Sequence, residues 1–252
     1  MNFTGRIVLV TGGSRGIGRA VAQLFAARGA RVAVHYHSNR SAAEETLSLL
    51  QGGGHILVQA DMASAADVQR MVETTIAQMG GLHILINNAG IYEEHPALDV
   101  DYETWQQSWA RTLATNLTGA ANAIYCAAQH WRNHGGGRVV NVSSRGAFRG
   151  EPAAPAYGAS KAGMNSMGQS LAKLLAPHGI FIGTVAPGWV ETDMATEHLK
   201  GPDGPAILAQ YPMGRIASPE EVAYAVLFMA SDGAEFTTGA VLDVNGASYL
   251  RT

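Results

Sequence analysis

A tyrosine and a lysine stand four residues apart in the segment Tyr157-Gly-Ala-Ser-Lys161. On a helix, residues at i and i+4 lie on one face, so the two side chains would be neighbours. The ordinary pKa of tyrosine is about 10, and a nearby ammonium group stabilises the phenolate and lowers that pKa. The pair could therefore act as a general acid or base at neutral pH. Lysine is rare in this chain, which makes Lys161 stand out among the basic residues.

A cluster of glycines precedes the first predicted helix. The segment Thr11-Gly-Gly-Ser-Arg-Gly-Ile-Gly18 directly follows the apolar run Arg6–Val10. Such a turn lets backbone N–H groups and a helix N-terminus approach a pyrophosphate. Its spacing, Gly12-x-x-x-Gly16-x-Gly18, differs from the G-x-G-x-x-G pattern of dinucleotide-binding folds. A turn without a ligand is the alternative, but the position after the first strand favours a dinucleotide site.

The residues at the end of the second predicted strand indicate which dinucleotide binds. An acidic residue about 20 positions after the glycines would bond the ribose hydroxyls of NAD. Here the segment His35-Tyr-His-Ser-Asn-Arg40 has no carboxylate, and Arg15 and Arg40 could each pair with a 2′-phosphate. The sequence therefore predicts NADP(H) over NAD(H), unless both arginines are solvated surface charges. His35 and His37 lack an evident third partner, so no metal site is expected.

Short apolar strands alternate with amphipathic helices along the chain. Strands buried on both faces read as near-continuous apolar runs, which is typical of a parallel sheet covered by helices. The expected fold class is therefore α/β, a Rossmann-type doubly wound sheet of seven parallel strands with helices on both faces, in one domain over residues 1–252. The expected strands are Arg6–Val10, Arg31–Tyr36, His55–Ala60, Leu82–Ile86, Arg138–Val142, Ile180–Val185 and Ala240–Val244. The expected helices are Gly16–Arg28, Ser41–Gln51, Ala65–Met79, Tyr102–Trp131, Tyr157–Ala176 and Pro219–Ala230.

Residues 190–218 show no clear periodicity and are rich in Gly, Pro and Met. Loops of that length inside a compact domain usually serve as lids or binding loops, so this segment is expected to be the substrate loop.

Charge and composition exclude several classes of protein. The formal net charge is −3, so the chain has no field for holding a polyanion and no nucleic-acid partner is expected. Cys126 is the single cysteine, which fits a reducing compartment and a cytoplasmic location. The uncharged run from Thr74 to Tyr92 contains several glycines and asparagines, so no membrane span is expected either.

The motifs together resemble the short-chain dehydrogenase/reductase family over essentially the whole chain. The likeness is greatest to the 3-oxoacyl-[acyl-carrier-protein] reductase-like branch, through Met213-Gly-Arg215 and Ser218-Pro-Glu-Glu221. Ser144, rather than Ser143, matches the family serine because it lies thirteen residues before Tyr157. The family motifs stand in order at Thr11–Gly18, Asp61, Asn87–Gly90, Asn116, Ser144, Tyr157, Lys161, Pro187-Gly188 and Thr192.

The resemblance implies an NAD(P)-dependent enzyme that acts on CH–OH groups and interconverts a small ketone and its secondary alcohol. Tyr157 would protonate the carbonyl oxygen during reduction. Lys161 would hold the nicotinamide ribose and depress the pKa of Tyr157. Ser144 would hydrogen-bond the substrate oxygen, and Asn116 would anchor a water in a proton relay toward Lys161.

The resemblance also implies the cofactor contacts. Asp61 would contact the adenine, Asn88 to Gly90 would line a ribose, and Pro187-Gly188 with Thr192 would hold the carboxamide side. Asn87 is interpreted instead as a buried amide that ties two strands together. The complete set of expected contacts is Gly12, Ser14, Arg15, Gly16, Ile17, Gly18, His37, Ser38, Asn39, Arg40, Asp61, Met62, Asn88, Ala89, Gly90, Tyr157, Lys161, Pro187, Gly188, Val190 and Thr192.

The substrate remains open at this stage. Carrier-protein reductases resemble one another in a basic docking patch, and the matching positions here are Gly135 and His178, with Arg132 and His134 close by. An acidic carrier protein would meet a weaker positive electrostatic field there than at the basic patch of carrier-protein reductases, so an acyl carrier protein is left open as a partner. A sugar, a polyol, a steroid-like molecule or another small carbonyl compound is the alternative to a 3-oxoacyl thioester. Aromatic residues (Tyr92, Phe148, Trp189) favour an apolar or ring-like substrate. Charged ones (Glu93, Glu94, Arg145, Arg149, Glu151) allow a polar substrate, unless they form a solvated rim.

Two other functional classes compete with a reductase. A non-catalytic NADP-binding sensor would be expected to lack the tyrosine or the lysine, and both are present. A serine hydrolase is suggested by Gly158-Ala-Ser160-Lys-Ala162, but a nucleophile elbow must directly follow a strand, and prolines precede this segment. The family resemblance further implies a homodimer or homotetramer.

Overall fold

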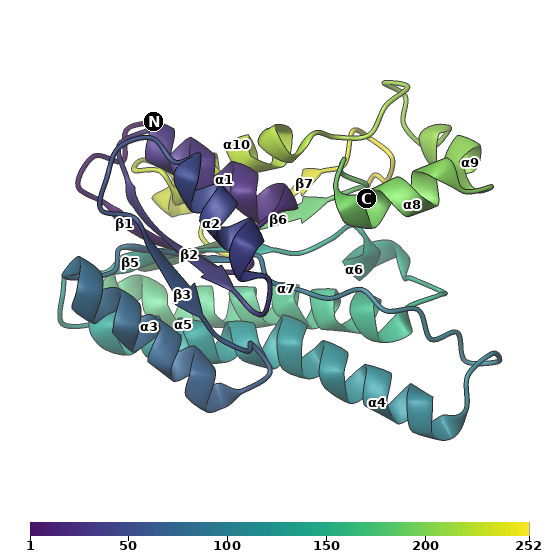
Figure 1. The fold of residues 1–252 in the computed structure, drawn as a ribbon, viewed down its shortest axis with the longest axis horizontal. Coiled ribbons are helices and arrows are strands. Elements are labelled where there is room, and N and C mark those ends of the chain that lie inside the picture. The colour runs from purple at the N-terminus through teal and green to yellow at the C-terminus, as the bar shows by residue number, and fades with distance from the viewer. Residues whose placement is uncertain (252) are drawn as a thin grey trace.

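In the computed structural model, residues 1–251 are described, apart from the side chains of residues 194, 197 and 198. The described residues form one parallel sheet with the strand order β3-β2-β1-β4-β5-β6-β7 (Figure 1). β1 pairs with β2 on one side and with β4 on the other, so the direction of winding reverses between them. This confirms the predicted doubly wound sheet. The strands are β1 (Ile7–Val10), β2 (Arg31–Tyr36), β3 (Ile56–Gln59), β4 (Ile84–Asn87), β5 (Gly137–Val142), β6 (Ile180–Pro187) and β7 (Val241–Val244).

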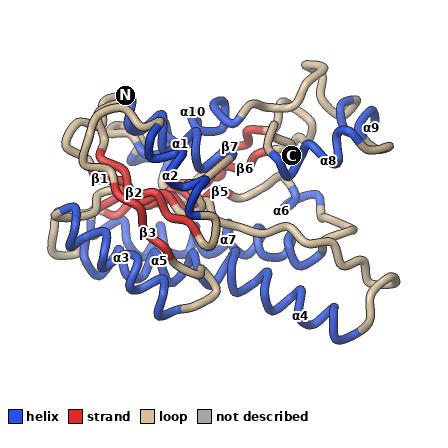
Figure 2. The backbone as a smooth tube through the Cα atoms, in the orientation of Figure 1, coloured by secondary structure: helices blue, strands red, loops and turns tan. Residues whose placement is uncertain are grey.

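Helices cover both faces of the sheet (Figure 2). One face carries α1 (Gly16–Ala27), α2 (Arg40–Ser48) and α10 (Pro219–Ala230), and the other carries α3 (Ala65–Met79), α5 (Gly119–Trp131) and α7 (Pro155–Leu175). Ser64 caps α3 through the backbone N–H of Asp67, and Ser218 forms a capping box with Glu221 at the start of α10. Among the described residues, none lies in a helix with the length and apolar character needed to cross a bilayer.

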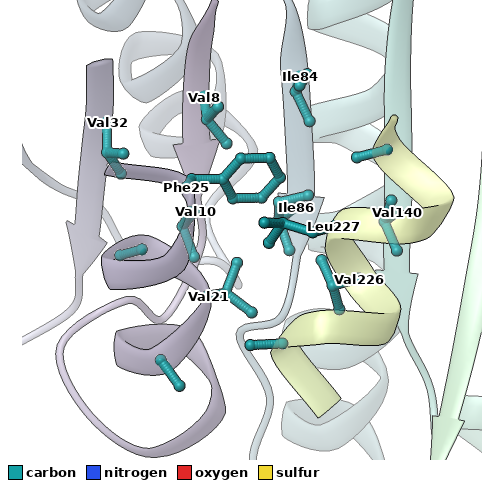
Figure 3. Packing of buried hydrophobic residues seen from close by; sticks show 14 of the residues in the cluster. Val8, Val10, Val21, Phe25, Val32, Ile84, Ile86, Val140, Val226 and Leu227 are labelled. Carbon is teal, nitrogen blue, oxygen red and sulfur yellow. The ribbon is translucent and has the colours of Figure 1, made fainter. Parts of the chain in front are cut away.

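Alternating residues of the central strands build two apolar cores. Val8 and Val10 of β1 face α1 and α10, where they pack with Phe25 and Leu227 (Figure 3). Ile7, Leu9 and their neighbours face α3, α5 and α7 instead. Because both faces of the central strands are buried, polar positions are scarce there, which explains the continuous apolar runs in the sequence.

Asn87 and Asn141 are two buried polar residues near the carboxyl ends of β4 and β5. They lie opposite each other in the register, and Asn87 Nδ2 donates to Asn141 Oδ1 over 3.0 Å. Both side chains are buried. The interpretation of Asn87 as an amide that ties strands together is confirmed.

Two sequence expectations about regular structure need correction. The single helix expected from Tyr102 to Trp131 consists of α4 (Tyr102–Leu113), the π-helical turn η1 (Ala114–Thr118) and α5. The segment 190–218 contains α8 (Asp193–Lys200) and α9 (Gly204–Leu208), and it was expected to lack regular structure. Ile207, Tyr211 and Ile216 form a small apolar cluster of their own. Such short-range contacts do not produce the long amphipathic pattern by which a helix is predicted from sequence. A short helix, α6 (Gly146–Arg149), was also not predicted, and the 3-10 turns are η2 (Ala176–His178) and η3 (Glu235–Thr237).

Candidate active site

A cleft of about 810 Å³ opens at the carboxyl ends of the central strands. Its walls come from the turns that follow β1, β4, β5 and β6, together with α7. This is where doubly wound sheets bind ligands, and the volume lies within the usual range of about 300–1,000 Å³ for ligand sites.

The tyrosine and the lysine of the sequence motif meet at this cleft on the first turns of α7. Pro155 begins the helix, where its missing N–H costs no hydrogen bond. Lys161 is buried, and its Nζ donates to the carbonyl oxygen of Val142 at the end of β5 over 2.8 Å. The Lys161 Nζ lies 5.7 Å from the centre of the Tyr157 ring. Ser144 follows β5 and forms a hydrogen bond with Tyr157, so the structure brings the three predicted catalytic side chains together.

The pKa of Tyr157 differs from the expectation. Burial raises it to about 12, the negative charge of Glu151 acts in the same direction, and the hydrogen bond with Ser144 opposes both. Burial also lowers the pKa of Lys161 to about 8. The predicted depression of the Tyr157 pKa by Lys161 is therefore not found in this structure. The physical reason is that burial penalises both the phenolate and the ammonium form.

Asn116 lies in the π-helical turn η1 and is completely buried. Its Oδ1 accepts from the backbone N–H of Ile91 over 2.8 Å, and its Nδ2 donates to Ile91 O and to Ser160 Oγ. A Cβ placed on Gly90 would lie 3.3 Å from Asn116 Oδ1 and 3.5 Å from Lys161 Nζ. Single π-turns within α-helices are frequent at functional sites, and this one brings Asn116 next to Lys161.

The glycine turn after β1 is built for close backbone approach. Gly12 has a φ of +62° and Gly16 a φ of +52°, conformations that favour glycine. A Cβ on Gly18 would lie 2.6 Å from Asn88 Nδ2 and would overlap the carbonyl oxygen of Gly12. No side chain caps the N-terminus of α1 at Arg15, and the residues of its first turn line the cleft. This glycine cradle and free helix N-terminus fit a pyrophosphate.

Asn88 has a role that the sequence did not indicate. Its Nδ2 donates to the carbonyl oxygens of Thr11 and Gly12, and its backbone N–H donates to Thr11 Oγ1. Thr11 Oγ1 in turn donates to the carbonyl oxygen of Ile86. The end of β4 therefore holds the glycine turn in place.

Most of the expected cofactor contacts line the cleft, and Arg40 does not. Arg40 Nε donates to Glu44 one turn along α2, and both side chains are largely exposed. These contacts agree with the alternative interpretation of Arg40 as a solvated surface charge. Arg15 lines the cleft with its guanidinium 3.8 Å from Asp193. The lining includes Gly12, Ser14, Arg15, Gly16, Ile17, Gly18, His37, Ser38, Asn39, Asp61, Met62, Asn88, Ala89, Gly90, Ser144, Tyr157, Lys161, Pro187, Gly188, Val190 and Thr192.

Comparison with known proteins gives the family. A family model described as enoyl-(acyl carrier protein) reductase matches residues 12–247. The 3-oxoacyl-[acyl-carrier-protein] reductase FabG of Escherichia coli (strain K12) is 36% identical over 250 residues, which cover 99% of this chain and 100% of that protein. The 3-oxoacyl-[acyl-carrier-protein] reductase of Synechocystis sp. is 36% identical, with 98% of each chain covered. The crystal structure of a putative short-chain alcohol dehydrogenase from Sinorhizobium meliloti 1021 has a TM-score of 0.92 and 31% identity, with 98% of this chain and 97% of that chain covered.

The chain belongs to the short-chain dehydrogenase/reductase family. It is an oxidoreductase that acts on CH–OH groups, in a family that uses nicotinamide cofactors. The matched names concern different bonds, since an enoyl group is reduced at C=C and a 3-oxoacyl group at C=O. Family membership thus leaves the substrate of this dehydrogenase/reductase open.

His95 supports α7, the helix of Tyr157, in this dehydrogenase/reductase and was not among the expected site residues. It is fully buried, and its Nε2 accepts from the backbone N–H of Ala156 over 3.3 Å. Its Nδ1 then carries the proton and donates to Glu93 O over 2.7 Å. His95 therefore caps the start of α7 next to Tyr157. No sequence signal predicts this, because the partner is 61 residues away.

Arg145 follows Ser144 and was expected as a polar substrate contact. Its guanidinium instead forms hydrogen bonds with other side chains of the protein. Nη1 donates to Ser248 Oγ over 2.7 Å, and Nη2 donates to Gln210 Oε1 over 2.8 Å. The guanidinium lies 5.5 Å from the centre of the Tyr211 ring, and the residue is only 3% exposed. Arg145 thus joins the loop of Ser144 to the segment 190–218 and to the C-terminal segment.

His35 holds the glycine turn of the dehydrogenase/reductase from behind. Its Nδ1 accepts from the backbone N–H of Gly12 over 2.9 Å. Its Nε2 therefore carries the proton and donates to Ala60 O over 3.1 Å. Burial lowers the pKa of His35 from 6.5 to about 4, so it is neutral at pH 7. The expectation that this histidine is a strand-end residue agrees with its contacts.

The stability of the protein should fall as the pH drops from 6.5 towards 4, because the unfolded chain then binds a proton at His35 that the native state excludes. His35 alone should account for about 2 kcal/mol of unfolding free energy at pH 5 relative to pH 7.5. Urea unfolding at the two pH values measures the loss, and the variant His35→Asn, less stable at pH 7.5, should show a smaller pH dependence. Arginines hold the pKa values of Glu221 and Glu235 at about 2. Protonation of these two carboxylates therefore lowers the stability of the protein only below about pH 4.5. An equal pH dependence in both proteins would contradict the prediction.

Proposed function

We propose that this chain is an NADP(H)-dependent oxidoreductase that interconverts a ketone and a secondary alcohol, with Tyr157 as the general acid and base. The observation that carries the proposal is the convergence of Tyr157, Ser144 and Lys161 beside a glycine turn that fits a dinucleotide. A bound nicotinamide cofactor supplies the hydride.

The protein's own groups handle the substrate oxygen and its proton. A phenol with a pKa of about 12 is protonated at neutral pH, so Tyr157 is ready to donate its proton in the reduction direction. The Ser144 hydroxyl, whose Oγ accepts from Gly146 N, can turn its own proton towards the same substrate oxygen. Lys161, whose pKa lies at about 8, can return a proton to Tyr157, and Asn116 anchors the inner end of that route.

The two competing classes receive less support. The hydroxyl of Ser160 donates to Tyr157 O and accepts from Asn116 Nδ2 inside the protein, and Ser160 is fully buried. A serine with these bonds is not positioned as a hydrolytic nucleophile. A non-catalytic sensor would not need the assembled group of Tyr157, Lys161 and Ser144.

NADPH should be the better cofactor, with a kcat/KM at least about tenfold above that of NADH. The end of β2 carries no carboxylate to repel a 2′-phosphate, and Arg15 lines the cleft nearby. The variant Arg15→Ala should lose most of this preference while keeping its activity with NADH. Arg28→Ala, an exposed arginine at the far end of α1, should keep the preference. A higher kcat/KM with NADH in the wild-type protein would contradict the proposal.

A 3-oxoacyl thioester is the first substrate to test, because relatives carry the name 3-oxoacyl-[acyl-carrier-protein] reductase. Absorbance at 340 nm, the NADPH band, should fall on addition of a suitable thioester, ketone or ketose. A surface hollow lined by Arg132 and His178 lies near the positions expected to dock an acyl carrier protein. Docking of that partner, the dimer or tetramer and the cytoplasmic location stay predictions.

A further inference from the structure

Glu151 lies inside the cleft, between the loop of Ser144 and the helix of Tyr157. It follows the turn at Gly150 that ends α6. A Cβ on Gly146 would lie 2.7 Å from Glu151 Cγ and would overlap its Oε1. A Cβ on Gly158 would lie 3.8 Å from Glu151 Cβ. Gly146, on the loop that follows Ser144, therefore makes room for this side chain, and Gly158 on α7 lies at an ordinary contact distance from it.

Glu151 lines the same cleft as Tyr92 and Tyr157. Its negative charge raises the pKa values of both Tyr92 and Tyr157, so it acts on both phenols. The rings of Tyr92 and Tyr157 pack edge to face with their centres 5.1 Å apart. Burial raises the pKa of Glu151 itself, and the charges of Arg149 and Arg145 oppose that shift.

Nearby charged groups are already engaged, whereas Glu151 is not. Arg145 and Arg149 both donate to Gln210 Oε1, and Arg111 forms an ion pair with Glu93 across the cleft. Within the described part of the chain, the Glu151 carboxylate has neither an ion pair nor a side-chain hydrogen bond. A partly buried carboxylate with free acceptor oxygens needs hydrogen-bond donors from a ligand or from solvent.

We propose that Glu151 accepts a hydrogen bond from a hydroxyl group next to the reacting carbonyl, so that the substrate is a hydroxylated carbonyl compound of the sugar or polyol type. The proposal rests on the proposed function of Tyr157. An ionised carboxylate offers acceptors only. A 3-oxoacyl thioester carries carbonyl oxygens and C–H groups around its ketone, so it has no O–H or N–H donor for Glu151 there. The positive charges of Arg149 and Arg145 act on Glu151 and would repel an ammonium group, which favours a neutral hydroxyl as its partner.

A matched pair of ketones tests the assignment. 1-Hydroxybutan-2-one and pentan-3-one differ by a hydroxyl in place of a methyl group. With NADPH, the wild-type kcat/KM should be at least about 100-fold higher for the hydroxyketone, because a site that bonds a hydroxyl discriminates strongly against its absence. Glu151→Gln should reduce this ratio at least about tenfold, since a neutral amide is the weaker acceptor. Glu94→Gln, the same change at an exposed residue outside the cleft lining, should leave the ratio unchanged.

Further arms separate this inference from the proposed function. The Glu151 assignment would be overturned if the ratio of kcat/KM between the two ketones were equal in the wild-type and Glu151→Gln proteins. It would also be overturned if acetoacetyl-CoA or 1-aminobutan-2-one had a higher kcat/KM than the hydroxyketone. Either result would leave the role of Tyr157 intact. A readout without turnover uses the Tyr157→Phe protein with NADPH. There butane-1,2-diol should bind at least about tenfold more tightly than pentan-3-ol by calorimetry, and additional Glu151→Gln should remove the difference. Equal Kd values for the two alcohols would overturn the assignment even if no ketone turns over.

Discussion

Replacement of Tyr157 by Phe should lower kcat/KM for ketone reduction by about 10²- to 10⁴-fold, the usual contribution of a positioned general acid. The change removes one hydroxyl group and keeps the ring. Because that ring packs edge to face against Tyr92 with its centre 5.1 Å away, the variant should retain its fold. The loss should appear in kcat, since proton donation matters in the transition state and little in substrate binding.

Steady-state kinetics with NADPH and the best ketone substrate measure this effect. The Kd for NADPH should stay within a few-fold of the wild-type value, which separates lost chemistry from lost binding. Tyr125→Phe provides the matched control, because Tyr125 lies on the exposed face of α5, 66% accessible. Activity of Tyr157→Phe near the wild-type level would overturn the proposed mechanism.

Gly18→Ala should both destabilise the protein and weaken NADPH binding. The new Cβ would overlap the carbonyl oxygen of Gly12 and lie 2.6 Å from Asn88 Nδ2. Neither neighbour can yield easily, because His35 holds the Gly12 N–H and Asn88 Nδ2 donates to Gly12 O over 3.1 Å. Overpacking of this kind costs about 1–3 kcal/mol, and here it also displaces the turn that fits the pyrophosphate.

Urea unfolding and NADPH titration together test the Gly18 prediction. We expect a loss of about 3 kcal/mol in unfolding free energy and at least about a tenfold rise in the Kd for NADPH. Gly53→Ala is the control, because a Cβ there meets nothing within 4 Å and the residue lies outside the left-handed region. That substitution should leave binding unchanged and stability equal or slightly higher. Wild-type affinity in Gly18→Ala would show that the glycine turn does not hold the cofactor.

Local patterns in the sequence were sufficient to predict the sheet, its helical layers, the glycine turn and the pair of Tyr157 and Lys161, and the family resemblance supplied the other motif residues that line the cleft. Strands buried on both faces must be apolar throughout, and the glycine turn, Tyr157 and Lys161 follow from spacing within a few residues. These features depend on residues that are close together in the chain, so they can be predicted from the sequence. The helices α8 and α9 escaped prediction because their apolar contacts are few and short in range.

Long-range packing determines the remaining features, for which the sequence carries no local signal. Burial of the site places the pKa of Tyr157 at about 12, opposite to the shift expected from Lys161. Burial likewise commits Arg145 to Ser248, 103 residues away, instead of to the substrate. Desolvation and contact between distant segments exist only once the chain has folded, because the unfolded chain leaves these groups in water and far apart.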